Sequence, residues 1–195
     1  AYHNECIGSL SLGVKIGETY TDYSQGSVRQ TGGTYDLALS GSGFFAVSVT
    51  DKAGEVHTRY TRDGRFHLTK DGLLVDADGN AVQGQNGNIT IDPSSKNVSI
   101  SATGQITADG ELVDTLNIVD FEDYDYLKKY GDTMYEPVDG ATTKDAEGEI
   151  LQGYTEQSNV NVVREMVDMI TITRAYEAGQ KVIRSYDSML SLIHI

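Results

Sequence analysis

The sequence predicts a mainly β fold followed by a long C-terminal α-helix, an α+β chain whose β-rich domain is built from short antiparallel strands. Two observations lead to this prediction. Between residues 41 and 121, Asp-Gly and Asn-Gly pairs separate short apolar runs, which is typical of consecutive β-hairpins. From residue 156 to 190 there is no proline, and apolar residues recur at every seventh position, which indicates a coiled-coil-like helix.

Three consecutive parts are expected along the 195 residues: an extended N-terminal segment (1–30), a β-rich domain (31–155) and the helix (156–195). Strands are expected at 44–49, 56–61, 65–69, 73–75, 88–91, 97–100 and 116–121. If Asp63-Gly64 forms a two-residue hairpin turn, Tyr60 faces His67. The stretch 109–149 contains thirteen acidic and three basic residues, and is expected to form surface loops and a short helix.

Charge and composition exclude several classes of function. The chain carries 29 acidic and 15 basic residues, a formal net charge of −14, which repels nucleic acid and anionic membrane surfaces. Cys6 is the single cysteine, so no disulfide can form within the chain and no cysteine metal cluster can be built. No run approaches the ~18 apolar residues of a membrane span, so membrane insertion is not expected.

The predicted helix has one clear apolar seam. Val162, Met169, Tyr176, Ile183 and Leu190 recur at intervals of seven, whereas the companion row that begins at Met166 continues with Thr173, Gln180 and Asp187. A two-stranded coiled coil needs both rows apolar, so contact with several neighbours is favoured. The predicted subunit-packing residues are Val162, Met166, Met169, Tyr176, Ile183 and Leu190. Gly179 lies inside the helix, where glycine costs about 1 kcal/mol relative to alanine, and it indicates either tolerance or close packing.

Motifs for catalysis or metal binding are lacking, so no catalytic residue, metal site or cofactor is predicted. The four histidines, His3, His57, His67 and His194, do not form an HExxH motif, and no cysteine pair accompanies them. The segment 76–87 begins like a calcium loop, but lacks its glycine at position six and its glutamate at position twelve. One alternative stays open. Asp120, Glu122, Asp123 and Asp125 could hold a carboxylate pair for glycoside hydrolysis, although an exposed charged loop is favoured.

Three segments together resemble the bacterial flagellar basal-body rod and hook proteins, and the resemblance is closest to the proximal and distal rod proteins. These segments are TDYSQGSVRQTGGTYDLALSGSGFFAV (21–47), YTRDGRFHLTKDGLLVDADGNAVQG (60–84) and EQSNVNVVREMVDMITITRAYEAGQKVIRSYDSML (156–190). The resemblance implies an axial structural subunit without catalysis, exported by the flagellar type III apparatus and located in the extracytoplasmic basal body. It implies self-assembly into the motility drive shaft, with terminal helices in the inner tube and the β domain outside. Copies of the chain and other rod or hook proteins are the implied partners, with no nucleic acid, membrane or small-molecule substrate.

The resemblance also selects residues. Its C-terminal signature falls on Asn159, Val160, Asn161, Met166, Met169, Tyr176, Glu177 and Ile183, and its β-domain signature on Gly41, Gly43, Phe44, Phe45, Asp63, Gly64, Phe66, Asp71 and Gly72. The family begins with an apolar helix and an Asn-rich motif that this sequence does not contain, so an N-terminally truncated member is expected. The tail at 191–195 does not resemble the family's usual polar ending.

Two rival functions remain. A hook subunit is the nearest alternative, but hook proteins generally carry larger outer insertions than this chain has. An extracellular carbohydrate-active β protein that uses the acidic residues 120–125 is the alternative from another class.

Overall fold

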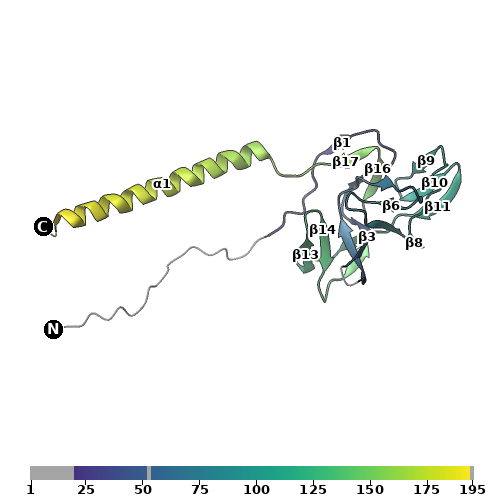
Figure 1. Ribbon diagram of the computed structural model, residues 1–195, viewed down its shortest axis with the longest axis horizontal. Helices are drawn as coiled ribbons and strands as arrows, with labels where there is room; N and C mark the ends of the chain where they lie inside the picture. Colours follow the sequence, from purple (N-terminus) through teal and green to yellow (C-terminus); the bar gives the residue numbers. More distant parts are fainter. Residues whose placement is uncertain (1–19, 52–53, 194–195) are drawn as a thin grey trace.

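The structure, a computed structural model, describes residues 20–51 and 54–193, with side chains up to residue 189. It consists of a β-rich body and one long helix, α1 (Val162–Ile193), which projects away from the body (Figure 1). The prediction of a mainly β fold with a long C-terminal helix is confirmed.

The strands of the body are short, and each pairs with its neighbours in the antiparallel direction. In chain order they are β1 (Val28–Gln30), β2 (Leu37–Ser40), β3 (Phe44–Thr50), β4 (Val56–Thr61), β5 (His67–Leu68), β6 (Leu74–Val75), β7 (Ala81–Gly84), β8 (Gly87–Asn88), β9 (Val98–Ile100), β10 (Gln105–Ala108), β11 (Glu111–Thr115), β12 (Ile118–Phe121), β13 (Leu127–Tyr130), β14 (Met134–Pro137), β15 (Thr143–Asp145), β16 (Glu149–Gln152) and β17 (Tyr154–Glu156). A 3₁₀ turn, η1 (Tyr124–Tyr126), precedes β13.

The largest sheet has ten strands: seven follow the order β13-β14-β4-β3-β7-β6-β5, β12 pairs with β3, β15 pairs with β12, and β8 pairs with β7. A three-stranded sheet follows the order β11-β10-β9. Two further pairs, β1-β17 and β16-β2, join segments that are far apart in the sequence. Since β17 ends six residues before α1 begins, the β1-β17 pair holds the base of the helix on the body.

Strand β3 lies between two hydrophobic cores. Successive side chains of a strand point to opposite faces, so Phe44 and Phe45 enter different clusters. Phe45 packs in the larger cluster, where its ring meets Phe66 edge-on at 5.3 Å between centroids. Phe44 packs in a smaller aromatic cluster with Phe121, at 6.0 Å. The two adjacent phenylalanines therefore connect the two hydrophobic clusters through strand β3.

The hairpins confirm most of the predicted turns, and one turn is wrong. Gly72, Gly79 and Gly110 have positive φ in the turns that join β5 to β6, β6 to β7 and β10 to β11. Asp63-Gly64 does not join a hairpin, because Tyr60 pairs with Ala46 of β3 and His67 pairs with Val75 of β6. At this point the chain leaves the β4 ladder and passes beside β2.

The acidic stretch was expected to be loops with a short helix, and this expectation is largely wrong. Residues 109–149 contain η1 but also β11 to β15 and the start of β16. The stretch can form strands because buried residues such as Phe121, Leu127 and Met134 alternate with its charged ones. Most of its charges stay at the surface, although Asp114 and Asp120 are buried.

Candidate assembly surface

Helix α1 begins with an asparagine cap. The Asn161 side-chain oxygen accepts hydrogen bonds from the backbone N–H groups of Val163 (3.1 Å) and Arg164 (3.2 Å). Such a cap satisfies N–H groups that have no partner inside the helix. Asn161, one of the family-signature positions, therefore has a local structural role as the cap of α1.

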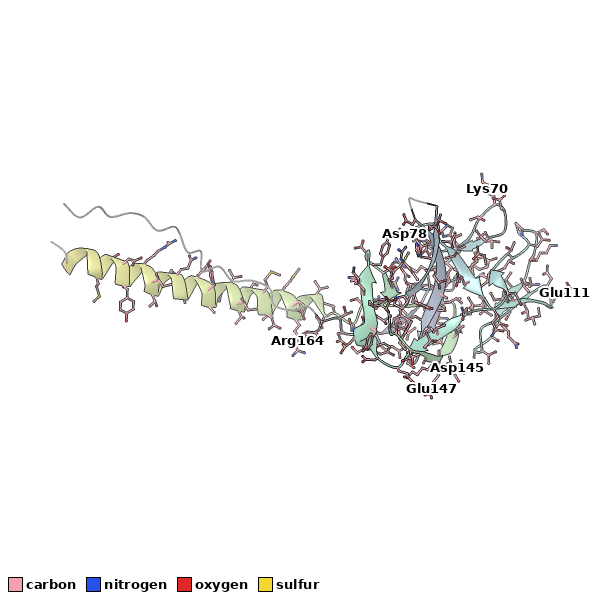
Figure 2. All side chains as sticks on the ribbon, turned by 90° about the horizontal axis from the view of Figure 1, so that it is seen from below. Lys70, Asp78, Glu111, Asp145, Glu147 and Arg164 are labelled. Carbon is pink, nitrogen blue, oxygen red and sulfur yellow. The ribbon has the colours of Figure 1, made fainter. Side chains whose placement is uncertain are left out.

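The predicted seam is exposed. Val162, Met166, Met169, Tyr176 and Ile183 are between 59% and 68% exposed, while the side chain of Leu190 lies outside the described residues. Every described side chain of α1 except Gln180 is exposed (Figure 2). The seam thus has no partner within the described part of the chain, and a partner must come from elsewhere if it is to be buried.

Sequence reasoning missed that the helix is apolar on its other sides as well. Seven further large apolar residues are more than half exposed: Val163, Val167, Ile170, Ile172, Val182, Tyr186 and Met189. Together with the seam they place large apolar side chains on every side of the helix, between its charged residues, so much of its surface would gain free energy from burial. A helical wheel of the whole segment, rather than a search for sevenfold spacing, would have revealed this. The surface formed by these residues and the seam is called the α1 surface below.

The threonines of α1 are compatible with burial. Thr171 Oγ1 donates to the carbonyl of Val167 at 2.9 Å, and Thr173 Oγ1 donates to that of Met169 at 2.8 Å. Because these hydroxyls are satisfied by the helix itself, they need no polar partner from outside. The companion row of the seam, which starts at Met166 and continues with Thr173, is therefore less polar at Thr173 than the residue type suggests.

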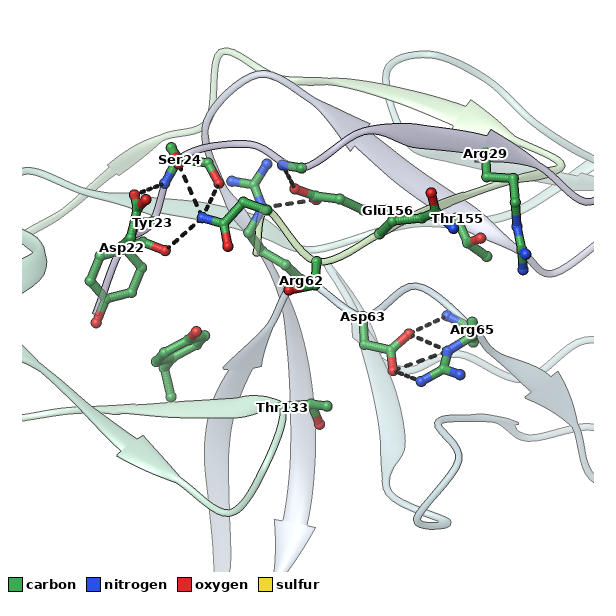
Figure 3. A pocket seen from close by; sticks show the side chains of 15 residues that line it. Asp22, Tyr23, Ser24, Arg29, Arg62, Asp63, Arg65, Thr133, Thr155 and Glu156 are labelled. Atoms are coloured by element: carbon green, nitrogen blue, oxygen red, sulfur yellow. Dashed lines mark hydrogen bonds and ion pairs between the residues drawn. The ribbon is translucent and has the colours of Figure 1, made fainter. Parts of the chain in front are cut away.

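A polar network ties the base of α1 to the body. Asn159 Nδ2 donates to the backbone oxygens of Asp22 (3.2 Å) and Ser24 (3.1 Å), so the segment before β1 lies beside the segment before α1 (Figure 3). Val160, its neighbour in the signature, is 54% exposed. Asn159 thus connects the segment before α1 to the segment before β1.

Arg62 is the centre of this network, and sequence reasoning did not select it. Its Nε lies 3.0 Å from Glu156 Oε2, and its terminal nitrogens donate to the carbonyls of Gly43 (3.2 Å) and Gly41 (2.8 Å). Glu156 in turn accepts from the N–H of Gly26 at 2.9 Å. One side chain therefore joins β17, the loop before β3 and the segment before β1. An adjoining polar hollow of about 550 Å³ is lined partly by these residues (Figure 3).

The β-domain signature residues are turn and core residues in the structure. Gly41 and Gly43 adopt φ of +116° and +129°, which L side chains rarely adopt. Gly72 also has positive φ, and a Cβ there would lie 2.3 Å from the carbonyl oxygen of Ile91. Asp71 is an exposed turn residue. The backbone conformation therefore explains why glycine stands at these three signature positions.

Asp63 and Gly64 organise the turn after β4. The carboxylate of Asp63 accepts two hydrogen bonds from Arg65 Nε, at 2.9 and 3.2 Å, and one from Nη2 at 2.7 Å. Gly64 is buried, and its carbonyl accepts from the N–H of Leu37 at 2.9 Å. The pair thus connects the end of β4 to β2.

The acidic residues proposed for glycoside hydrolysis have structural partners. Asp120 is fully buried, and its Oδ1 accepts from Tyr124 Oη and from the N–H of Phe121, both at 2.8 Å. Lys144 Nζ lies 3.1 Å from Oδ2, close enough for an ion pair although not aligned for a hydrogen bond. Burial alone would raise the pKa of Asp120, but the hydrogen bonds to its charged form hold the pKa below its usual value. Burial and this carboxylate raise the pKa of Tyr124 to about 12.

The other members of the acidic group point to no shared site. Glu122 Oε2 accepts from the hydroxyl of Thr142 at 3.0 Å, and Asp123 caps η1 by accepting from the N–H of Asp125 at 2.9 Å. Glu122, Asp123 and Asp125 are exposed. Asp120, Glu122 and Asp123 are each held by groups of their own turn or strand, and Asp125 is exposed, so the described residues show no carboxylate pair gathered in a cleft.

The central histidines also lie apart from any cluster. His57 and His67 are exposed on different strands, while His3 and His194 lie outside the described residues. Within residues 20–51 and 54–193, no three His, Cys, Asp or Glu side chains are grouped as metal ligands. None of the helices in this described part is long and apolar enough to cross a membrane.

Two family sequence models match the chain. The model described as "Flagellar basal body rod FlgEFG protein C-terminal" matches residues 151–193, and "Flagellar hook protein FlgE/F/G D1 domain" matches residues 38–108. The first match covers β17 and α1, with the α1 surface, and the second covers the centre of the β-rich body from β2 to β10.

Named relatives match nearly the whole chain. The flagellar basal-body rod protein FlgG of Buchnera aphidicola subsp. Schizaphis graminum is 36% identical over 194 residues, which cover 93% of this chain and 72% of the relative. FlgG of Agrobacterium fabrum is 34% identical over 199 residues, covering 95% and 73%. The basal-body rod protein FlgF of Caulobacter vibrioides is 37% identical over 162 residues, covering 82% and 64%.

Proposed function

The chain belongs to the flagellar basal-body rod protein family as a structural subunit, and on this basis we propose that α1 assembles the rod by packing against helices of neighbouring subunits. In this proposal the C-terminal part of the chain, residues 156–195, which contains α1, lies in the inner axial tube, and the β-rich body, residues 31–155, makes lateral and axial contacts outside it. The observation that carries the proposal is the α1 surface, a set of large apolar side chains that are exposed on every side of the helix. The matched relatives are rod proteins, which supports a rod rather than a hook subunit.

Burial of the α1 surface supplies the driving force. Exposed apolar side chains gain about 25 cal/mol for each Å² removed from water. Helices in proteins are stabilised mainly by tertiary packing, and α1 packs on no part of the described body along its length. Assembly would therefore stabilise both the contact and the helix itself.

The same proposal covers partners, place and chemistry. The partners are copies of this chain and other rod or hook subunits, and the place is the extracytoplasmic part of the basal body. The role is mechanical rather than catalytic, which agrees with carboxylates such as Asp120 being held by Tyr124 and Lys144. The Arg62–Glu156 network would keep the helix in a fixed direction while torque passes through the body.

Thiol accessibility tests the proposal directly. In a Cys6→Ser background, Ile183→Cys places a thiol on the seam, and Lys181→Cys places one about 160° away around the helix. Both positions are exposed in the single chain, so a maleimide reagent should label them at similar rates in dilute solution. After assembly, labelling at position 183 should become about tenfold slower or more, because a buried thiol is inaccessible.

The variant at position 181 is the matched control, since it carries the same thiol on the same two turns of helix. It should keep more of its labelling rate than the variant at 183. Equal labelling of position 183 in the dilute and assembled states would contradict burial of the seam.

A further inference from the structure

The methionines of the chain fall into two groups. The sequence contains four, and Met134 lies in the larger hydrophobic cluster of the body, where it is 6% exposed. Met166, Met169 and Met189 lie on α1 and are 59%, 68% and 57% exposed. Three of the four thioether groups are therefore accessible to reagents in water while the chain is unassembled.

Two of the exposed methionines lie on the side of α1 that carries the seam. Met169 is a seam residue, and a separation of three residues places Met166 about 60° from it around the helix. Met189 follows Met169 by twenty residues, which places it about 160° away, on the opposite side of the helix. The helix thus carries two accessible thioethers at the seam and one of similar exposure away from it.

Peroxide is the oxidant that such an exposed thioether meets in its simplest form. A lone pair of the methionine sulfur attacks one oxygen of hydrogen peroxide, the S–O bond forms and the O–O bond breaks. The departing hydroxide takes up a proton and leaves as water. The sulfur loses two electrons and the peroxide gains them, and the product is methionine sulfoxide, which converts a flexible apolar side chain into a polar one.

A sulfoxide at the seam is unfavourable once the seam is buried. Its oxygen is a hydrogen-bond acceptor, and a buried acceptor needs a donor. The hydroxyls of Thr171 and Thr173, the threonines nearest to Met169 on α1, already donate to the carbonyls of Val167 and Met169. These hydroxyls are therefore not available to the sulfoxide, and oxidation at position 169 removes free energy from any contact that buries it.

We propose that Met166 and Met169 form a peroxide-sensitive modification site that controls whether the unassembled chain can assemble. This inference rests on the proposed function and adds a chemical regulation of the same surface. Oxidation of the two seam methionines leaves the β-rich body folded, because Met134 is buried, but it prevents burial of the seam. Assembly in turn protects the two methionines, because a buried thioether does not meet peroxide.

The test treats the full 195-residue chain, in a Cys6→Ser background, with hydrogen peroxide in dilute solution. Mass spectrometry of its peptides measures the oxidation rate of each methionine, and we expect the three on α1 to react about tenfold faster or more than Met134. Sedimentation equilibrium of the oxidised chain should then show association about tenfold weaker or more. Treatment with methionine sulfoxide reductase should restore the association, which distinguishes the sulfoxide from irreversible damage.

Two matched variants locate the effect. Met166→Leu with Met189→Leu leaves Met169 as the methionine of α1, and Met166→Leu with Met169→Leu leaves Met189. Leucine conserves the volume of methionine, so both variants should associate nearly as the original chain does before oxidation. After complete oxidation of α1, the variant that keeps Met169 should lose about tenfold or more in association, and the variant that keeps Met189 should stay within about threefold.

Met169→Glu separates the modification site from the proposed function. If Met169→Glu loses association but the oxidised chain retains it, the modification site is disproved and the proposed function stands. Equal losses in the two oxidised double variants, or oxidation of Met134 as fast as that of Met169, also disprove the site. Failure of the unoxidised chain to associate, or full association of Met169→Glu, contradicts the proposed function and the modification site together.

Discussion

Replacing Met169 and Ile183 together by glutamate is expected to abolish self-association of the chain while leaving the unfolding free energy of the β-rich body unchanged. Both side chains are exposed in the single chain, at 68% and 63%, so the new carboxylates remain in water there. In the assembly they would be buried without partners, at a cost of several kcal/mol each. Association should fall by a factor of about 100 or more.

Sedimentation equilibrium measures the association. Thermal unfolding, followed by the circular dichroism of the β-rich body, measures the stability of that body. The matched control, Thr171→Glu with Ser185→Glu, adds the same two charges at exposed positions outside the seam. It should weaken association less. Association of the Met169→Glu, Ile183→Glu variant equal to that of the original chain would exclude the seam as the contact.

Gly64→Ala should be among the most destabilising single substitutions in the body. A Cβ at this position would lie 1.8 Å from the carbonyl oxygen of Leu37 and 2.7 Å from its carbon. These are backbone atoms of β2, and Leu37 is fully buried, so the overlap cannot be relieved by turning a side chain. The hydrogen bond from the N–H of Leu37 to Gly64 must stretch or break. We expect a loss of about 3 kcal/mol in unfolding free energy, measured by urea denaturation.

Gly110→Ala is the control for this prediction. Gly110 adopts φ of +93° in the β10–β11 turn, but nothing lies within 4 Å of its Cβ position. Alanine there suffers only backbone strain, of about 1 kcal/mol. A loss at Gly64 no greater than the loss at Gly110 would contradict the close approach of β2 to the turn.

Local signals predicted much of the fold. The run 56–61 is strand β4 as expected, and Asp-Gly at 71–72 and 78–79 marks turns with positive φ at glycine. The sevenfold spacing from Val162 to Leu190 correctly predicted a long C-terminal helix. These features depend on neighbours in sequence, which is why pattern and turn chemistry suffice for them.

Long-range contacts were beyond sequence reasoning. Gly64 looked like a hairpin glycine, but it is needed because β2, 27 residues earlier at Leu37, passes against it. No sequence motif marks Arg62 as the centre of the network, because its partners Glu156 and Gly41 come from distant segments of the chain. The acidic stretch looked like loops because its charges dominate the composition, whereas buried residues such as Leu127 and Met134 lie between the charges and support the pairing of β13 with β14. In each case the decisive partner is set by the fold rather than by local pattern.

Hydrogen exchange tests most directly the claim that assembly with other subunits stabilises α1. In a dilute, monomeric sample, amides of β3, whose residues 44–47 are fully buried, should exchange slowly, and amides of residues 166–189 should exchange rapidly. After assembly, the helix amides should slow by a factor of about 100 or more, while β3 changes little. Strong protection of residues 166–189 in the monomer would contradict this account, because the helix would then have a partner within its own chain.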